Sequence, residues 1–265
     1  MSGTIPDHPS VSERFFFDNY GYLLLEDFLS NDLVATLIQA LEKTISKRRT
    51  PGFKRDIEPA FPDQLDSNNS RVFHLLDEDP VFLQMLDYQP MLEYVHGLFN
   101  EMPHLHSTDA FYEVVPGKHH GRGWHIDGIQ SGFRNFKPHI PFLQFKVGYI
   151  LSDLSVPDQG NLTVIPGSHK SLCEPDADDL SNPELLVGAK QICGPPGTAV
   201  IFHNALWHMA GPFTHSGGRR VMLYYGYEHP WMLACAEQWR YPEEFYRDLG
   251  PVQRKFFHDF VFEST

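Results

Sequence analysis

Apolar residues in the first hundred positions recur at helical spacing. Four of them share one face of a helix: Val34, Ile38, Leu41 and Ile45. Ser30 can cap the N-terminus of this helix, and the basic residues 47–49 lie where the negative end of the helix dipole attracts cations. The pattern therefore predicts a scaffold helix between residue 30 and about residue 49.

Further local signals complete this N-terminal region. Ser10 and Glu13 have the spacing of a capping box, so a short helix is expected there, with a strand at 22–25 after it. Pro90 can begin another helix, because proline fits the first helical turn. The stretch 50–70 has the character of a loop.

After about residue 103 the helical spacing fades. Short runs rich in aromatic and β-branched residues alternate with Pro, Gly, Asn and Asp, which is typical of strands and turns. The expected strands are 110–115, 142–151, 162–165, 199–202, 206–209 and 219–227. Many short strands without long helices between them predict a mainly β fold, an antiparallel jelly roll on which the N-terminal helices pack.

The whole chain, 1–265, is expected to be one domain. Within it we distinguish a mainly helical N-terminal layer at 1–102, a jelly-roll core at 103–230 and a C-terminal extension at 231–265. No linker divides these parts, and 42% hydrophobic residues are enough to fill one large core.

Composition excludes some partners. A net charge of −13 would repel a nucleic-acid backbone, so no nucleic-acid partner is expected. No apolar run reaches the roughly 20 residues needed to cross a bilayer, so no membrane partner is expected either. Three cysteines without a CxxC pair fit reduced thiols in a cytoplasmic protein. The sequence does not specify an oligomeric state.

The segment Trp124–Gly128 is a candidate metal site. His125 and Asp127 are two residues apart, so on a strand they point to the same face and can bind one ion together. Two imidazoles and one carboxylate on a single face are typical of non-haem iron(II) oxygenases, in which open metal positions admit co-substrate and oxygen. Spacing alone leaves His203 and His208 as alternatives for the second histidine.

Four sequence blocks resemble the phytanoyl-CoA dioxygenase family of iron(II)/2-oxoglutarate oxygenases, in family order and at family spacing. They are Trp124-His125-Ile126-Asp127; Gly160-Asn161-Leu162-Thr163-Val164-Ile165-Pro166-Gly167-Ser168-His169; Gly197-Thr198-Ala199-Val200-Ile201-Phe202; and Trp207-His208-Met209-Ala210-Gly211-Pro212 followed by Gly218-Arg219. The resemblance implies a double-stranded β-helix, a cupin-like jelly roll.

The resemblance also implies roles for particular residues. It selects His208 as the third metal ligand, beside His125 and Asp127, and it places Arg219 against the far carboxylate of 2-oxoglutarate. Arg220 is the alternative if the strand register slips by one residue. Tyr149 occupies a family position that can line the co-substrate pocket, although it can equally be a core aromatic residue.

The implied chemistry consumes O2 and 2-oxoglutarate at iron(II), releases succinate and CO2, and by default hydroxylates a C–H bond of a small molecule. Asp127 disfavours halogenation, since related halogenases have a small residue in its place. Ile126 and Phe213 depart from the usual family residues and imply a differently shaped pocket wall. Residues 128–141 are expected to form a lid beside the metal.

Two other functions remain open at this stage. The same three ligands could hold zinc for hydrolysis, or the jelly roll could be a binding or regulatory module with a structural metal. The sequence does not name the substrate. Its net charge would favour a cationic or neutral molecule, but net charge is a poor guide to one pocket.

Overall fold

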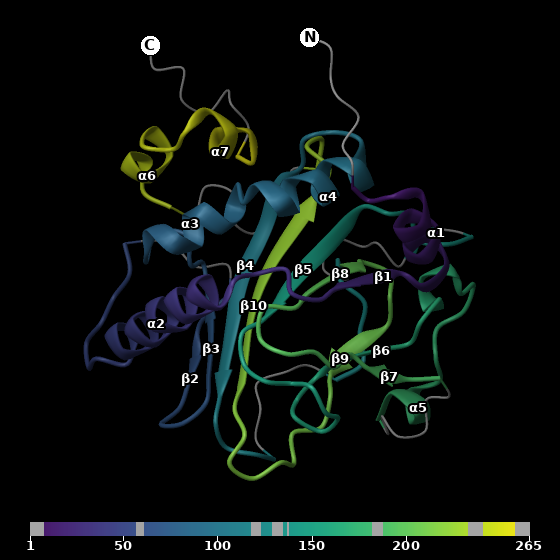
Figure 1. Cartoon of the computed structure of the whole chain (residues 1–265), viewed down its shortest axis with the longest axis horizontal. Coiled ribbons are helices and arrows are strands. Elements are labelled where there is room, and N and C mark those ends of the chain that lie inside the picture. The colour runs from purple at the N-terminus through teal and green to yellow at the C-terminus, as the bar shows by residue number, and fades with distance from the viewer. Residues whose placement is uncertain are drawn as a thin grey trace.

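Two antiparallel sheets form the centre of the computed structural model (Figure 1), which describes residues 8–56, 61–117, 123–128, 135–136, 138–181, 188–232 and 241–257. The larger sheet has seven strands in the order β1-β8-β5-β10-β4-β3-β2, and the smaller has three in the order β7-β6-β9. This confirms the mainly β jelly-roll class that the strand pattern predicts.

The strands of the large sheet come from most of the chain. Their bounds are β1 Tyr22–Leu25, β2 Gln64–Leu65, β3 Ser70–Phe73, β4 His104–Glu113, β5 Gln144–Ile150, β8 Ala199–His203 and β10 Arg220–Glu228. Those of the small sheet are β6 Leu162–Val164, β7 Lys190–Gln191 and β9 His208–Ala210.

Helices cover one face of the large sheet, while the small sheet faces the other (Figure 1). The helices on that face are α1 Val11–Tyr20, α2 Asn31–Arg48, α3 Pro80–Leu86, α4 Gln89–Phe99, α6 Glu243–Arg247 and α7 Pro251–Lys255. Helix α5, Ala177–Ser181, lies beside the small sheet, and a short 3-10 turn spans Ser168–Lys170. Within the described chain, no helix is both long and apolar enough to cross a membrane.

The predicted helix signals hold at the atomic level. Ser10 and Glu13 form the capping box of α1, and the Ser30 hydroxyl accepts a hydrogen bond from Leu33 N at the start of α2. Pro90 lies in the first turn of α4. The first turn of a helix leaves backbone N–H groups without a partner. The serine caps accept hydrogen bonds from such groups, and Pro90 has no N–H to satisfy.

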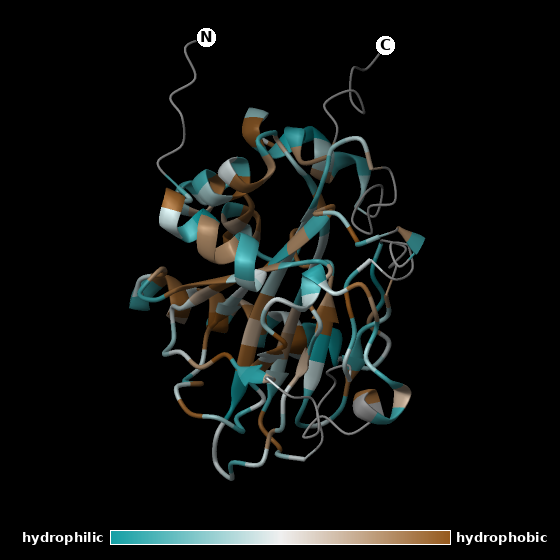
Figure 2. Ribbon diagram, turned by 90° about the vertical axis from the view of Figure 1, so that its right-hand side faces the viewer, coloured by the Kyte–Doolittle hydropathy of each residue, from teal (hydrophilic) through white to brown (hydrophobic). Residues whose placement is uncertain are grey.

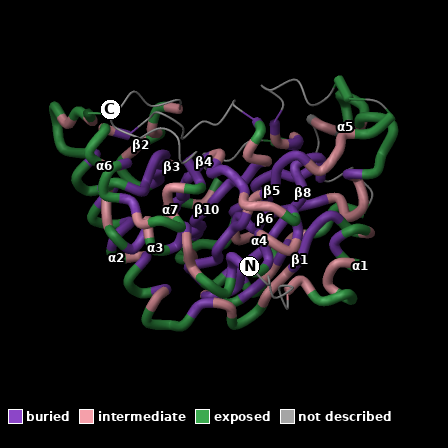
Figure 3. The backbone as a smooth tube through the Cα atoms, turned by 90° about the horizontal axis from the view of Figure 1, so that it is seen from above, coloured by how far each residue is buried: buried purple, intermediate pink, exposed green. Residues whose placement is uncertain are grey.

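Successive side chains along a strand point to opposite faces of the large sheet, which divides the interior into two apolar cores. In β5, Val147 and Tyr149 face the helices, whereas Ile150 faces the small sheet. The same holds in β10, where Tyr225 and Tyr224 belong to different cores. The large sheet is buried on both faces, as the tube coloured by burial shows (Figure 3), and the apolar residues gather along its strands (Figure 2).

The N-terminal region contributes more than helices. Strands β2 and β3 extend the large sheet beyond β4, although the sequence pattern indicated a loop at 50–70 and no strand after it. Strand β4 also begins at His104 instead of residue 110. The prediction failed there because β2 and β3 are short, which leaves little local periodicity, and because β3 joins the sheet through β4, about 40 positions away.

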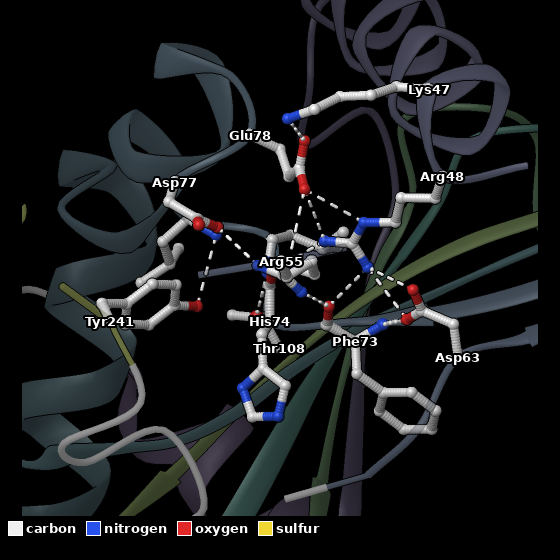
Figure 4. Close-up of polar contacts among 12 residues, drawn as sticks. Lys47, Arg48, Arg55, Asp63, Phe73, His74, Asp77, Glu78, Thr108 and Tyr241 are labelled. Atoms are coloured by element: carbon white, nitrogen blue, oxygen red, sulfur yellow. Dashed lines mark hydrogen bonds and ion pairs between the residues drawn. The ribbon is translucent and has the colours of Figure 1, made fainter. Parts of the chain in front are cut away.

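A network of ionic groups attaches α2 to the end of β3 (Figure 4). The side chain of Arg48 is fully buried and bonds Asp63, Glu78 and two backbone carbonyl oxygens, those of Phe73 and His74. The Asp63 carboxylate also accepts from Phe73 N at 3.0 Å. Arg48 therefore holds the C-terminal end of β3, the strand that carries Arg71 into the interior.

Because Glu78 is only 3% exposed, we expect Arg48→Met to lower the free energy of unfolding by about 3 kcal/mol. The matched control is Arg247→Met, which removes an exposed pair with Glu243 and should change stability by less than about 0.5 kcal/mol. Urea unfolding of both variants measures the difference, and equal effects would contradict this account of the network.

Candidate metal centre and its cavities

His125 and His208 are joined through their backbones, 83 positions apart in the sequence. The N–H of each donates to the carbonyl oxygen of the other at 2.9 Å, which forms an isolated antiparallel bridge. Asp127 N in turn donates to Asn204 O at 2.8 Å. Residues 125–127, which precede the predicted lid, are thus fixed by hydrogen bonds to Asn204 and to His208 at the start of β9.

This pairing gathers the three residues that the sequence singled out. One ligand atom each from His125, Asp127 and His208 can be chosen so that all lie within 4.8 Å of one another. In the described residues this is the sole group of three or more His, Cys, Asp or Glu side chains so arranged. The fold therefore brings His208, and not His203, to the HxD segment.

Both imidazoles are oriented as metal ligands. His125 Nδ1 lies 2.7 Å from Gly123 O, and His208 Nδ1 lies 2.9 Å from Leu206 O. A carbonyl oxygen only accepts, so each Nδ1 carries the proton and each Nε2 keeps its lone pair. His208 Nε2 lies 3.8 Å from Asp127 Oδ2, which is consistent with both atoms binding a common ion.

The protonation states also fit a metal site. Burial, followed by the neighbouring His208, lowers the pKa of His125 to about 3, so this imidazole is neutral at physiological pH. Burial by itself would raise the pKa of Asp127, but Lys146 and the two histidines hold that pKa below its usual range. Asp127 Oδ2 is buried and has no hydrogen-bond partner among the described residues, which is unusual unless an ion satisfies it.

A cavity of about 410 Å³, counting its open mouth, lies between the two sheets beside the histidines. His125 and His208 line one part of it, and the large sheet contributes Phe111, Phe202 and Arg220. We call it the inner cavity. Its walls combine apolar and aromatic side chains with charged and imidazole groups, and converging polar groups of this kind orient ligands in small-molecule sites.

Arg220, not Arg219, lines the inner cavity. Strand β10 begins at Arg220, whose side chain is buried and pairs with Glu113 at 2.7 Å. The side chain of Arg219 points the other way, is 46% exposed and lies 3.8 Å from Glu42. The sequence placed Arg219 at the cavity, but Arg220 is the arginine that faces it, because alternation along a strand reverses the direction of neighbouring side chains.

One hydrogen-bond donor of Arg220 is not engaged by any residue that the structure describes. Its Nε is buried without a hydrogen-bond partner among the described residues, while Nη1 is engaged by Glu113. Gly160, with φ +78°, lies against the Arg220 Cδ, where an added Cβ would clash. The glycine of the second sequence block is therefore needed for this arginine to lie where it does.

Tyr149 does not line the inner cavity. It belongs to the core on the helical side of the large sheet, where its ring stacks with Phe28 at 6.5 Å. Lys146, three positions earlier in β5 and on the other face, is the residue of this strand that reaches the cavity. The expected pocket role of Tyr149 is therefore contradicted, and the alternative of a core aromatic residue is correct.

His203 and His169 lie together elsewhere, with ring centroids 4.9 Å apart. His203 Nδ1 accepts a hydrogen bond from Ala205 N, and burial lowers the pKa of His203 well below its usual value. His169 contacts Asp18 O through Nε2, within the turn expected from its PGSH segment. Neither belongs to the triad.

A second cavity of about 540 Å³, again counting its open mouth, touches the other side of the triad and is here called the outer cavity. It shares four residues with the inner cavity: Arg71, Asp109, His125 and Lys146. The sequence analysis missed Arg71, Asp109 and Lys146, which lie on three different strands. The only available signal was a charged residue within an otherwise apolar strand run, most visible for Lys146 in PFLQFKVGYIL.

The predicted lid at 128–141 is only partly visible. Gly128 and Pro138 line the outer cavity and a neighbouring pocket, respectively, whereas 129–134 and 137 lie outside the described residues.

Comparison with known proteins decides the family. The family model for Phytanoyl-CoA dioxygenase (PhyH) matches residues 17–221, more than half of the chain. The chain belongs to the phytanoyl-CoA dioxygenase family. This confirms the resemblance carried by the four sequence blocks, and with it the enzyme class, an iron(II)- and 2-oxoglutarate-dependent oxygenase.

Individual relatives of this family member are distant. The ectoine dioxygenase of Sphingopyxis alaskensis is 23% identical over 261 residues, covering 85% of this chain and 82% of the relative. The structure of that species' EctD with bound Fe has a TM-score of 0.68 at 22% identity, with 91% and 83% of the two chains covered. Streptomyces hygroscopicus HygX, with nickel and 2-oxoglutarate bound, has a TM-score of 0.64 at 16% identity, with 84% and 88% covered. At these identities the structures establish a shared fold.

We expect His208→Ala to weaken metal binding by more than roughly 100-fold, because losing a ligand should cost at least as much as losing a ligand's supporting hydrogen bond. His203→Ala is the matched control and should bind metal like the unmodified protein. Calorimetric titration with cobalt(II) under anaerobic conditions measures both. Loss of binding in His203→Ala with retention in His208→Ala would reverse the assignment.

Proposed function

We propose that this protein hydroxylates an unactivated C–H bond of a small molecule, with release of succinate and CO2. The observation that carries the proposal is the inner cavity, because His125, His208 and the buried Arg220 all line it. A dicarboxylate can then bridge the metal position and the guanidinium within one cavity.

His125, Asp127 and His208 would hold iron(II). The donor set of two neutral imidazoles and one ionised carboxylate suits this ion and leaves other coordination positions open. The carbonyl oxygens of Gly123 and Leu206 keep the two rings oriented. When bound, iron(II) and 2-oxoglutarate supply the oxidising power for cleavage of the C–H bond.

Arg220 would bind the far carboxylate of 2-oxoglutarate. A guanidinium offers a planar set of donors to a carboxylate, and its edge through Nε is not engaged by Glu113. Phe111 and Arg220 are stacked, with the guanidinium carbon 4.3 Å from the ring centroid, which fixes the plane of the donors. Phe111 and Phe202 exclude water from the co-substrate.

The proposed roles of the two arginines can be tested with conservative variants. Arg220→Lys keeps a positive charge beside the buried Glu113 but loses the planar donor edge. We expect it to raise the Kd of 2-oxoglutarate by roughly 10- to 150-fold, which corresponds to about 1.5–3 kcal/mol for hydrogen bonds to a charged group. Arg219→Lys should have little effect. The measurement is an anaerobic titration of the iron(II) protein with 2-oxoglutarate, followed by the visible charge-transfer absorption of the chelate.

The same titration tests the proposed function as a whole. A zinc hydrolase or a module with a structural metal would bind metal but would not respond to 2-oxoglutarate. Absence of the absorption band in folded, iron-loaded protein would therefore contradict the proposal. A band that Arg219→Lys weakens and Arg220→Lys leaves unchanged would retain the function but overturn the choice of arginine.

A further inference from the structure

Three charged side chains separate the inner cavity from the outer cavity. Lys146 on β5, Asp109 on β4 and Arg71 on β3 line both spaces next to His125. They lie beside the triad and take no part in it. Their own pairing shows which of the three is available to a ligand.

Arg71 and Asp109 satisfy each other. Arg71 donates to Asp109 Oδ2 through Nε at 3.2 Å and Nη2 at 2.9 Å. Its guanidinium also lies between the rings of Phe73 and Phe111, 4.6 Å from each centroid. A guanidinium held by two hydrogen bonds and two aromatic faces is fixed, and its charge is compensated.

Lys146 is not matched in this way. Its side chain is 19% exposed, and its Nζ lies 3.7 Å from Asp127 Oδ1 and 3.9 Å from Asp109 Oδ1. Both distances exceed those of a hydrogen bond, and the remaining described contact is with the Tyr224 ring at 6.0 Å. Three ammonium donors in a largely enclosed position are therefore held near two carboxylates without bonding either.

Metal binding would further weaken the attraction between Lys146 and Asp127. A carboxylate that donates to a metal ion has less negative charge to offer a neighbouring ammonium. Asp109 compensates Lys146 only in part, since its Oδ2 already accepts two hydrogen bonds from Arg71 and its Oδ1 stays 3.9 Å from Lys146 Nζ. We propose, on the basis of the function proposed above, that Lys146 binds a carboxylate of the substrate in the outer cavity and so places the substrate beside the metal.

The rest of the outer cavity indicates the class of molecule. Phe61 and Phe73 give it an aromatic wall, and Ser107 adds a hydroxyl. A small carboxylate with an apolar body fits this combination of one cation and aromatic surface. Lys146 thus favours an anionic ligand, whereas the net charge of −13 would favour a cationic or neutral substrate.

The test uses matched probes on the anaerobic protein loaded with iron(II) and 2-oxoglutarate. Straight-chain carboxylates from acetate to hexanoate are compared with their primary amides as perturbants of the charge-transfer band. We expect the carboxylates to perturb it at lower concentrations than the amides. Lys146→Met should lower the affinity for the carboxylates by roughly tenfold or more, and Lys146→Arg should retain much of that affinity. Calorimetry on the nickel(II) protein provides a second readout of binding.

The controls separate the outcomes. Lys43→Met removes the same charge from an exposed position of α2 and should leave the carboxylate preference unchanged. If acids and amides behave alike in the unmodified protein, the inference is wrong. It is also wrong if Lys146→Met leaves the preference for carboxylates over amides intact, since the carboxylates would then bind the metal. A Lys146→Met variant that binds 2-oxoglutarate itself more weakly would contradict it as well. Absence of the band before any probe is added would instead contradict the proposed function.

Discussion

The reciprocal backbone hydrogen bonds between His125 and His208 are the contact on which the candidate site depends. They connect a short segment between β4 and β5 to the small sheet, so the two imidazoles lie side by side with ring centroids 4.2 Å apart. Asp127 follows two residues later, and its own N–H is held by Asn204. The ligand geometry is therefore a property of the backbone pairing, and the side chains need few further restraints beyond the two carbonyl oxygens that orient the rings.

Strand alternation is the second constraint, and it sets which residues can reach the cavities. The large sheet is apolar on both faces, so each strand divides its residues between the helical core and the interior next to the small sheet. Lys146 and Tyr149 illustrate the effect on β5, and Arg220 and Arg219 illustrate it at the start of β10. A displacement of one residue exchanges a buried cavity residue for a surface or core residue.

Much of this organisation could be predicted from the sequence. The capping residues of α1 and α2 act locally, and His125 and Asp127 share a face by simple periodicity. His208 and the family came from four motifs taken together. The family resemblance placed Arg219 at the co-substrate. The sequence alone could not show that Arg220 faces the cavity, because its position depends on a pairing with Glu113, a residue 107 positions away. Arg71, Asp109 and Lys146 lie on separate strands that only the folded sheet brings together, and β2 and β3 leave too little local pattern to be recognised.

The central claim is that one metal ion is held by His125, Asp127 and His208 beside a cavity that Arg220 also lines. The most direct test is a crystal structure of the protein with iron(II) and 2-oxoglutarate, solved with anomalous data collected at the iron absorption edge. We predict a single strong anomalous peak bonded to Nε2 of both histidines and to the Asp127 carboxylate, with the far carboxylate of 2-oxoglutarate on Arg220. A peak elsewhere, or one that leaves out His208, would contradict the account.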